Sequence, residues 1–245
     1  MRAPLLILLA LLASACSPPE EKASEAPSDQ APSPVGEAAP EPEEAPRNEI
    51  VVVFLGDSLT AGYGLDEDRA FPALVQERLR AEDYSVRVIN GGVSGDTTAG
   101  GLQRVSWLLR QEPDVMMVAL GGNDGLRGMD LDASQENLEG ILRQVEDAGV
   151  KVLLAGMLIP PNYGENYTAS FAAIYPRLAK TLGVPLLPFL LEGVAGDPEL
   201  NQADGIHPTA AGQEILAGTV IEHLRPLIDQ VIAEQASRAD TEIRP

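Results

Sequence analysis

A serine, a histidine and an aspartate in this 245-residue chain have the types and spacing of a nucleophile and its activating base. Ser58 follows the apolar run EIVVVFL at 49–55. His207 and Asp204 lie in QADGIHPTAAG, where Pro208 places the histidine on a loop at the entry to a helix. Asp204 can accept the imidazole N–H and so fix the tautomer that takes a proton from a serine. We therefore predict a catalytic triad of Ser58, His207 and Asp204.

A serine nucleophile also needs donors aimed at the oxyanion that forms on the substrate. The candidates are the backbone N–H groups of Ser58 and of Gly95, in SGDTT, and the side-chain amide of Asn123, in GGNDG. Taken alone, the last two motifs are typical of turns and helix caps. Asp57 is interpreted as bracing the loop through a hydrogen bond rather than as a second acid, and His223 is assigned no role.

The elements that must position these residues alternate between strands and helices. Buried strands are indicated by Val-, Ile- and Leu-rich runs at 49–55, 86–90, 114–120, 150–156 and 184–188. Helices are predicted near 71–82, 98–110, 133–148, 168–182 and 208–234. This alternation predicts one three-layer α/β domain with a five-stranded parallel sheet. Loops that leave the carboxyl ends of parallel strands emerge at one edge, which would bring the candidate residues together.

Four short motifs in this order, GDSLT, SGD, GGND and DGIHP, resemble the sequence blocks of the SGNH, or GDSL, hydrolases. The four block residues of that family fall on Ser58, Gly95, Asn123 and His207, and the triad acid of the family falls on Asp204. The segments GGNDGLRG, PPNYGENYTASFAAIYPRLAK and VPLLPFLLE resemble the bacterial branch of thioesterase I, arylesterase and lysophospholipase enzymes. The resemblance implies a flavodoxin-like sheet and a serine esterase or thioesterase without a metal or other cofactor. The implied substrate is a small acyl ester or a lysophospholipid.

Rival interpretations differ in what they require of the motifs. A nucleotide-binding loop at GDSLTAGYG would need a Walker lysine or the G-x-G-x-x-G spacing, and the chain has neither there. A non-catalytic ligand-binding lipoprotein predicts the loss of a triad member, whereas all three are present. A carbohydrate acetylesterase remains an alternative because the same family includes such enzymes. The segment YGENYTAS at 163–170 either lines an acyl groove or supplies polar loop residues.

The first sixteen residues, MRAPLLILLALLASAC, are typical of a secretory signal, which we assign to 1–15. The apolar core at 5–13 is much shorter than the ~20 residues of a membrane-spanning helix. Cys16 is the only cysteine, so no internal disulfide can form. The stretch LASAC resembles a bacterial lipobox, which predicts a lipid anchor at Cys16 that holds the protein to a membrane. Cleavage by an ordinary signal peptidase, leaving a free thiol, is the alternative.

Composition separates a tether from a folded body. Residues 17–47 contain eight prolines, eight acidic residues and no aromatic residue, which is typical of a disordered segment. We therefore predict a tether at 16–47, a hydrolase domain at 48–235 and a flexible tail at 236–245. Without the first 47 residues the net charge is −15, which argues against a nucleic-acid partner. We expect a monomer outside the cytoplasm, anchored to the cell envelope (periplasm or outer membrane) or secreted.

Overall fold

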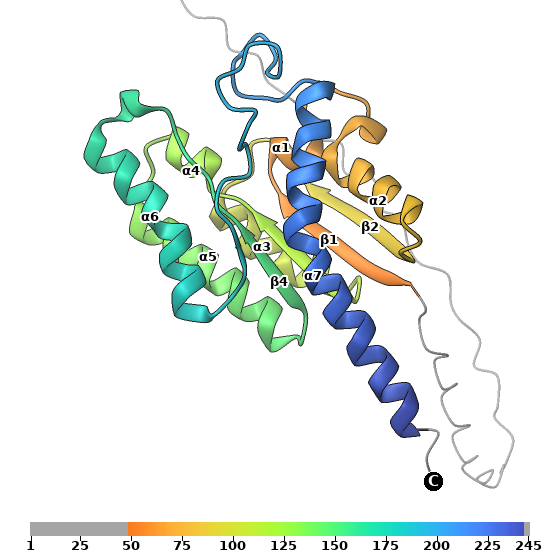
Figure 1. The fold of residues 1–245 in the computed structure, drawn as a ribbon. Helices are drawn as coiled ribbons and strands as arrows, with labels where there is room; N and C mark the ends of the chain where they lie inside the picture. Colours follow the sequence, from red (N-terminus) through yellow and green to blue (C-terminus); the bar gives the residue numbers. More distant parts are fainter. Residues whose placement is uncertain (1–48, 243–245) are drawn as a thin grey trace, which may run out of the picture. The chain divides into compact units, whose positions relative to one another are not determined.

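Figure 1 shows the computed structural model of the chain, which describes residues 49–242. The predicted signal peptide at 1–15, Cys16 and the predicted tether at 16–47 lie outside the described residues. The strands are β1 Ile50–Gly56, β2 Val86–Gly92, β3 Val115–Ala119, β4 Lys151–Ala155 and β5 Leu186–Leu187. The α-helices are α1 Ser58–Ala61, α2 Phe71–Ala81, α3 Thr98–Leu109, α4 Gly122–Leu126, α5 Leu131–Asp147, α6 Glu165–Leu182 and α7 Ala210–Glu242, and two short 3₁₀ helices span Glu67–Arg69 and Pro161–Tyr163.

The five strands form one parallel sheet in the order β2-β1-β3-β4-β5. This is the flavodoxin order, in which the chain reverses direction across the sheet between β2 and β3. Every residue of β1 and β3 is buried, as expected for strands that helices cover on both faces. The predicted three-layer α/β domain with a five-stranded parallel sheet is confirmed.

Helices cover the sheet in two groups (Figure 1). Helix α2 packs against α7 on one face, whereas α3, α5 and α6 pack in succession on the other. Phe71, the first residue of α2, is fully buried and meets Phe54 of β1 edge to face, with ring centroids 5.4 Å apart. Burying a side chain of this size contributes about 1.5–3 kcal/mol, so such contacts fix where the helix lies on the sheet.

Helix boundaries follow ordinary capping chemistry. Thr97 accepts a hydrogen bond from the Gly100 N–H at the start of α3, and Asp130 accepts from the N–H groups of Asp132 and Ala133 at the start of α5. Helix α6 ends at Gly183, whose φ of +74° is the left-handed conformation that glycine adopts without strain. These caps fall close to the boundaries that the sequence predicts.

Four elements, β5, α1, α4 and α7, differ from the sequence prediction. Strand β5 is only two residues long because Pro185 and Pro188 flank it and cannot donate to the ladder. The short helices α1 and α4 are not among the predicted elements. Helix α7 continues to Glu242, beyond the predicted end at 234, so residues 236–242, which the sequence analysis assigned to a flexible tail, are helical. The stretch AEQASRADTE at 233–242 contains no glycine or proline to stop the helix.

Within 49–242, no helix is long and apolar enough to cross a membrane.

Candidate active site

The loops that leave β1, β2, β3 and β5 bring the predicted site residues to one edge of the sheet. Ser58 is half-buried and begins α1 directly after β1. Asp57 caps this helix by accepting a hydrogen bond from the Leu59 N–H at 3.0 Å. A side chain at Gly56 would place its Cβ 1.9 Å from the Thr60 hydroxyl, so only glycine lets the chain turn from strand into helix here.

His207 connects the serine to an acid through both of its ring nitrogens. Its Nε2 lies 2.9 Å from the Ser58 hydroxyl, and its Nδ1 lies 2.7 Å from the Asp204 carboxylate. The backbone N–H and the imidazole of His207 bond to Asp204 and, with the Ile206 N–H, lower the pKa of that carboxyl to about 2. Asp204 is therefore ionised at neutral pH and holds Nδ1 in its protonated form, which leaves Nε2 to accept a proton.

A hairpin-like tip carries the acid and the base. Between β5 and α7, Asn201 forms an antiparallel bridge with Pro208, and the Gln202 N–H donates to the His207 carbonyl at 2.7 Å. The side-chain amide of Asn201 is buried and donates to two carbonyls of the preceding loop. Gly205, with a φ of +70°, makes the turn between Asp204 and His207. This pairing explains how a long loop presents two side chains in fixed positions.

The two further oxyanion donors that the sequence predicts lie beside this triad. Gly95 has a φ of +80° in the turn before α3, and Asn123 lies in the first turn of α4. The Asn123 amide donates to the Asp96 carbonyl at 2.9 Å, which ties the two donor-bearing loops together. The Arg127 guanidinium donates to the Gly95 carbonyl at 3.0 Å and to Asn123 Oδ1 at 3.3 Å. These bonds set the orientation of the amide, with its nitrogen on the side of Asp57 and Asp96.

Asp124, next to Asn123, fixes α4 to the layer of helices behind it. Its buried carboxylate accepts hydrogen bonds from the backbone N–H and the hydroxyl of Thr98, at 3.0 and 2.6 Å, and from the hydroxyl of Ser134 at 3.1 Å. A buried carboxylate needs such donors because burial without them is costly. The acidic residue of GGND thus anchors the short helix that presents Asn123.

Asp57 braces the site and stands outside the triad, which matches the role that the sequence analysis gave it. It is only 2% exposed, and Asn123 Nδ2 donates to its Oδ2 at 3.3 Å. Burial raises the pKa of Asp57 from 3.8 to about 6, although the Leu59 N–H, His207 and Asn123 act in the opposite direction. His223 lies within α7, where its Nδ1 is 3.0 Å from the Thr219 carbonyl of the same helix.

Arg104 is a residue of this edge that the sequence analysis did not identify. Its guanidinium bonds to the Asp96 carboxylate at 2.7 Å and to the carbonyls of Gly91 and Gly56 at 2.6 and 2.8 Å. It therefore ties the ends of β1 and β2 to the Gly95–Asp96 turn. A charged residue within the apolar pattern of GLQRVSWLL is the signal that could have identified it.

The segment at 163–170 contacts the last residue of α4 and the loop that follows it. The hydroxyl of Tyr163 donates to the Leu126 carbonyl at 2.7 Å, and the hydroxyl of Tyr167 donates to the Met129 carbonyl at 3.0 Å. Leu158, Tyr163, Met129 and Ile206 expose more than a third of their side chains. The hydroxyl groups of Tyr163 and Tyr167 thus hold the neighbouring segment, and a role of 163–170 in an acyl groove stays a prediction.

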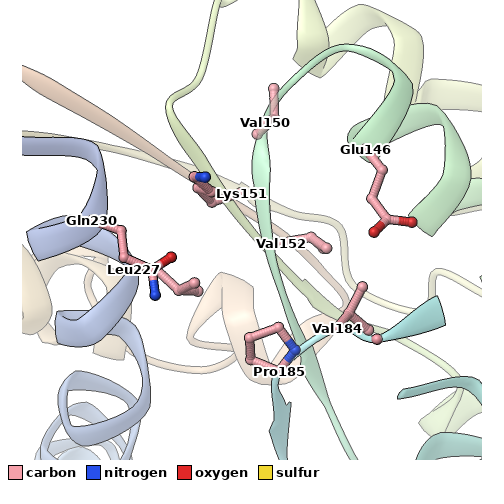
Figure 2. Close-up of a pocket in the computed structure, with 9 residues that line it drawn as sticks. Glu146, Val150, Lys151, Val152, Val184, Pro185, Leu227 and Gln230 are labelled. Atoms are coloured by element: carbon pink, nitrogen blue, oxygen red, sulfur yellow. The ribbon is translucent and has the colours of Figure 1, made fainter. Parts of the chain in front are cut away.

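A hollow of about 310 Å³ lies at the opposite, amino-terminal edge of the sheet (Figure 2). Its walls come from the starts of β4 and β5, the end of α5 and one face of α7, and it is lined by Glu146, Val150, Lys151, Val152, Gly183, Val184, Pro185, Leu227 and Gln230. Lys151 forms an ion pair of 2.6 Å with Glu234 of α7. These lining residues include no serine, histidine or cysteine, so this hollow has no pair of the serine–histidine kind. Among residues 49–242, no group of three His, Cys, Asp or Glu side chains is placed to hold a metal ion.

Comparison with known proteins identifies the family. Residues 54–215 match the model of the GDSL-like lipase/acylhydrolase family. The chain is similar to the esterase TesA of Pseudomonas aeruginosa, with 45% identity over 178 residues that cover 72% of this chain and 89% of the relative. It is also similar to thioesterase 1/protease 1/lysophospholipase L1 of Escherichia coli K12, with 42% identity over 179 residues that cover 73% and 85% of the two chains.

A solved structure supports the same family as both relatives do. The crystal structure of the psychrotrophic esterase EstA from a Pseudoalteromonas species has a TM-score of 0.70 and 31% identity, and the match covers 73% of this chain and 98% of that one. The resemblance to SGNH hydrolases that the four motifs predict is therefore confirmed, as is the fold that it implies. The chain belongs to the GDSL-like lipase/acylhydrolase family and is a serine esterase.

Proposed function

We propose that this enzyme cleaves its esters through an acyl-enzyme on Ser58, with His207 as general base and acid and Asp204 as its partner. The observation that carries the proposal is the continuous line of hydrogen bonds, 2.9 Å from the Ser58 hydroxyl to His207 and 2.7 Å from His207 to Asp204. Both distances are within the reach that proton transfer requires. The low pKa of Asp204 supports its role as the ionised partner of the imidazole.

The geometry supports acyl transfer in two halves. In the first half, His207 Nε2 takes the Ser58 proton as Oγ bonds to the acyl carbon, and the carbonyl oxygen becomes an oxyanion. The N–H groups of Ser58 and Gly95 stabilise that oxyanion, and the Asn123 amide joins them by turning one N–H away from its 3.3 Å bond to Asp57. His207 then returns the proton to the leaving alkoxide or thiolate. In the second half, water attacks the acyl carbon, its proton passes through His207 to Ser58 Oγ, and the acid leaves.

The proposed substrates are aryl and alkyl esters and lysophospholipids, with acyl thioesters as a secondary class. The printed names of the two relatives, esterase and thioesterase/lysophospholipase, support this range. The exposed apolar side chains of Leu158, Tyr163 and Ile206, at the same edge as the triad, favour an acyl chain over a polar group. The charge of −15 outside the first 47 residues disfavours the polyanionic head of acyl-coenzyme A, so aryl esters of the same acyl chain should react faster at low salt.

The proposal extends to where the enzyme works. The signal-like segment at 1–15 and the lipobox-like LASAC favour a diacylated Cys16, and the proline-rich residues that follow favour a tether between this anchor and the domain. Esters that reach the cell envelope would then be its substrates. If this proposal is right, the wild-type protein fractionates with membranes and Cys16→Ala is released in a fully active form. A soluble wild-type protein would contradict the anchor.

Labelling with a fluorophosphonate tests the nucleophile directly. The related EstA was solved in a form inhibited by monoethylphosphonate, and a phosphonate is therefore a suitable probe. We expect one label on wild-type protein and on the control Ser106→Ala, whose serine is exposed on α3, and none on Ser58→Ala. Label that persists in Ser58→Ala would refute the assignment.

A substrate panel tests the class of ester. p-Nitrophenyl esters of increasing chain length, lysophospholipids, acyl-coenzyme A and acetylated sugars should be compared by kcat/KM. We expect the highest values for aryl esters and measurable release of fatty acid from lysophospholipids. Highest activity on acetylated sugars would replace this proposal with the carbohydrate acetylesterase.

A further inference from the structure

The ring of Tyr63 lies against one face of the His207 imidazole. The two ring centroids are 4.5 Å apart and the rings are tilted by 38°. Tyr63 follows α1, and its backbone N–H donates to the Ser58 carbonyl at 3.0 Å. The side chain is 51% exposed, so the hydrophobic core does not account for its position. Tyr63 therefore connects the backbone of the predicted nucleophile with the ring of the predicted base.

Gln202 holds this contact from both sides. Its side-chain amide donates to the Tyr63 carbonyl at 2.7 Å and to the Pro208 carbonyl at 3.0 Å, while its backbone N–H donates to the His207 carbonyl at 2.7 Å. Gly64 leaves room for the amide, because a Cβ there would lie 2.5 Å from Gln202 Oε1. The loop that carries Tyr63 and the tip that carries His207 are thus joined by one side chain.

The two hydrogen bonds of the imidazole leave one motion of the ring free. Both bonds lie along the ring nitrogens, to Asp204 and to Ser58, so they resist in-plane displacement far more than tilting about the line that joins them. Contact with an aromatic face resists this tilt. The requirement is greatest in the acyl-enzyme, where Ser58 Oγ carries the acyl group and no longer holds a proton to share with Nε2. At that stage, of the contacts described above, the imidazole keeps those with Asp204 and with the Tyr63 ring.

We propose that Tyr63 is a positioning residue that keeps the His207 imidazole aligned, above all while water attacks the acyl-enzyme. This inference rests on the proposed triad. In the step concerned, the water oxygen bonds to the acyl carbon, His207 Nε2 takes the water proton, and the bond to Ser58 Oγ breaks as that oxygen receives the proton. A tilted imidazole would miss the water even though the acyl group is already in place.

Pre-steady-state kinetics with p-nitrophenyl acetate separates the two halves of the reaction. We expect Tyr63→Ala to lower kcat about tenfold, the size of effect that one aromatic contact supports. KM should fall with it, so that kcat/KM changes much less, and a burst of p-nitrophenolate close to one per enzyme should precede the steady state. Tyr63→Phe keeps the ring and should stay within about twofold of wild type. Gln202→Ala should change kcat and KM in the same direction as Tyr63→Ala.

Trp107→Ala is the matched control, because Trp107 is an aromatic residue on α3 that is 52% exposed. It should leave the burst and both constants unchanged. Three results would each overturn the inference. The first is an unaltered kcat in Tyr63→Ala, and the second is a loss of kcat in Tyr63→Phe as large as that in Tyr63→Ala. The third is a fall in kcat/KM of Tyr63→Ala as large as the fall in kcat, without a burst. Ser58→Ala, assayed alongside, distinguishes the failures: if it is inactive while Tyr63→Ala is normal, only the role of Tyr63 is lost, and if it is active, the triad itself is wrong.

Discussion

The two edges of the sheet are built from the same five strands and differ in what surrounds them. At the carboxyl edge, strand ends lead into Ser58, Gly95 and Asn123, and the hairpin-like tip adds Asp204 and His207. At the amino edge, the strand starts and α7 form a mainly aliphatic hollow with one ion pair between Lys151 and Glu234 (Figure 2). A concave shape is present at the second edge, whereas the first edge carries the proposed nucleophile, Ser58, hydrogen-bonded to its proposed base, His207.

The difference follows from the direction of the strands. In a parallel sheet, the helices that follow the strands begin near the carboxyl edge and return to the amino edge. Helix α3 begins at Thr98, three residues after Gly95, so the positive end of its dipole favours negative charge at this edge, although the Thr98 and Gly100 N–H groups already donate to Asp124 and Thr97. Helices α5 and α6 end near the amino edge, where their carbonyl ends favour a cation such as Lys151. The carboxyl edge is thus electrostatically suited to stabilise an anion before any side chain is considered.

The largest effect should come from removing the triad at the carboxyl edge. Ser58→Ala and His207→Ala should each reduce ester turnover to near background, and the double variant should lose little more, because the two residues act as a unit. Steady-state kinetics on purified protein with a p-nitrophenyl ester provides the measurement. Lys151→Ala, at the amino edge, should keep wild-type kcat/KM. Equal losses at both edges would mean that the loss of activity reflects damage to the fold and not to the chemistry.

Removing one oxyanion donor should have the next largest effect. Asn123→Ala should cost about 2.7–4 kcal/mol of transition-state stabilisation, seen as a fall in kcat. Gln230→Ala removes an amide of similar size from the hollow at the amino edge and should leave kcat unchanged. Near-normal turnover of folded Asn123→Ala would remove this residue from the oxyanion site.

Stability should depend on pH through Asp57 at the carboxyl edge. Its pKa is about 6 in the folded protein and 3.8 in the reference state, so the folded protein binds the proton more tightly between these values. Raising the pH through this window should therefore lower the unfolding free energy by about 3 kcal/mol, and Asp57→Asn should abolish this loss. Urea unfolding of both proteins from pH 4 to 8 measures it.

Asp204 gives the opposite sign and serves as the comparison for Asp57. Its pKa is lowered to about 2, so the stability that it contributes is present above about pH 4 and is lost as the pH falls toward 2. Asp204→Asn should therefore lose its stability difference from wild type in that acidic range. An Asp57→Asn difference that does not change with pH between 4 and 6 would show that burial leaves this carboxyl unperturbed.

The smallest effect should come from the ion pair at the amino edge. Lys151 and Glu234 expose 32% and 48% of their side chains, and exposed pairs contribute about 0–1 kcal/mol. Lys151→Met should therefore change the unfolding free energy by less than about 1 kcal/mol, with esterase activity unchanged. A larger loss of stability would mean that the hollow depends on this pair to hold α7 against β4.

The sequence predicts the sheet and the candidate residues that the structure brings together, and the reason is local. Apolar runs of five to seven residues mark β1 and β3, and motifs such as GDSL and DGIHP place Ser58 and His207 next to strand ends or helix starts. The contacts that hold these motifs together are different in kind. Arg104 and Gln202 each join segments that are far apart in the chain, and such pairings leave no periodic signal in one sequence. The last turns of α7 differ from both the motifs and these contacts, because helix propensity forms them without burial in the core.

Strand β1 lies between β2 and β3 and runs from the amino edge of the sheet to the carboxyl edge. It enters at Ile50 on the amino edge and delivers Ser58 just beyond Gly56 on the carboxyl edge, a path of about 23 Å at the usual rise of a strand. A bead, chip or fusion partner coupled directly ahead of Glu49 would therefore be attached at the edge of the sheet opposite Ser58. Attachment at this point should leave the edge that carries the proposed nucleophile open to substrate.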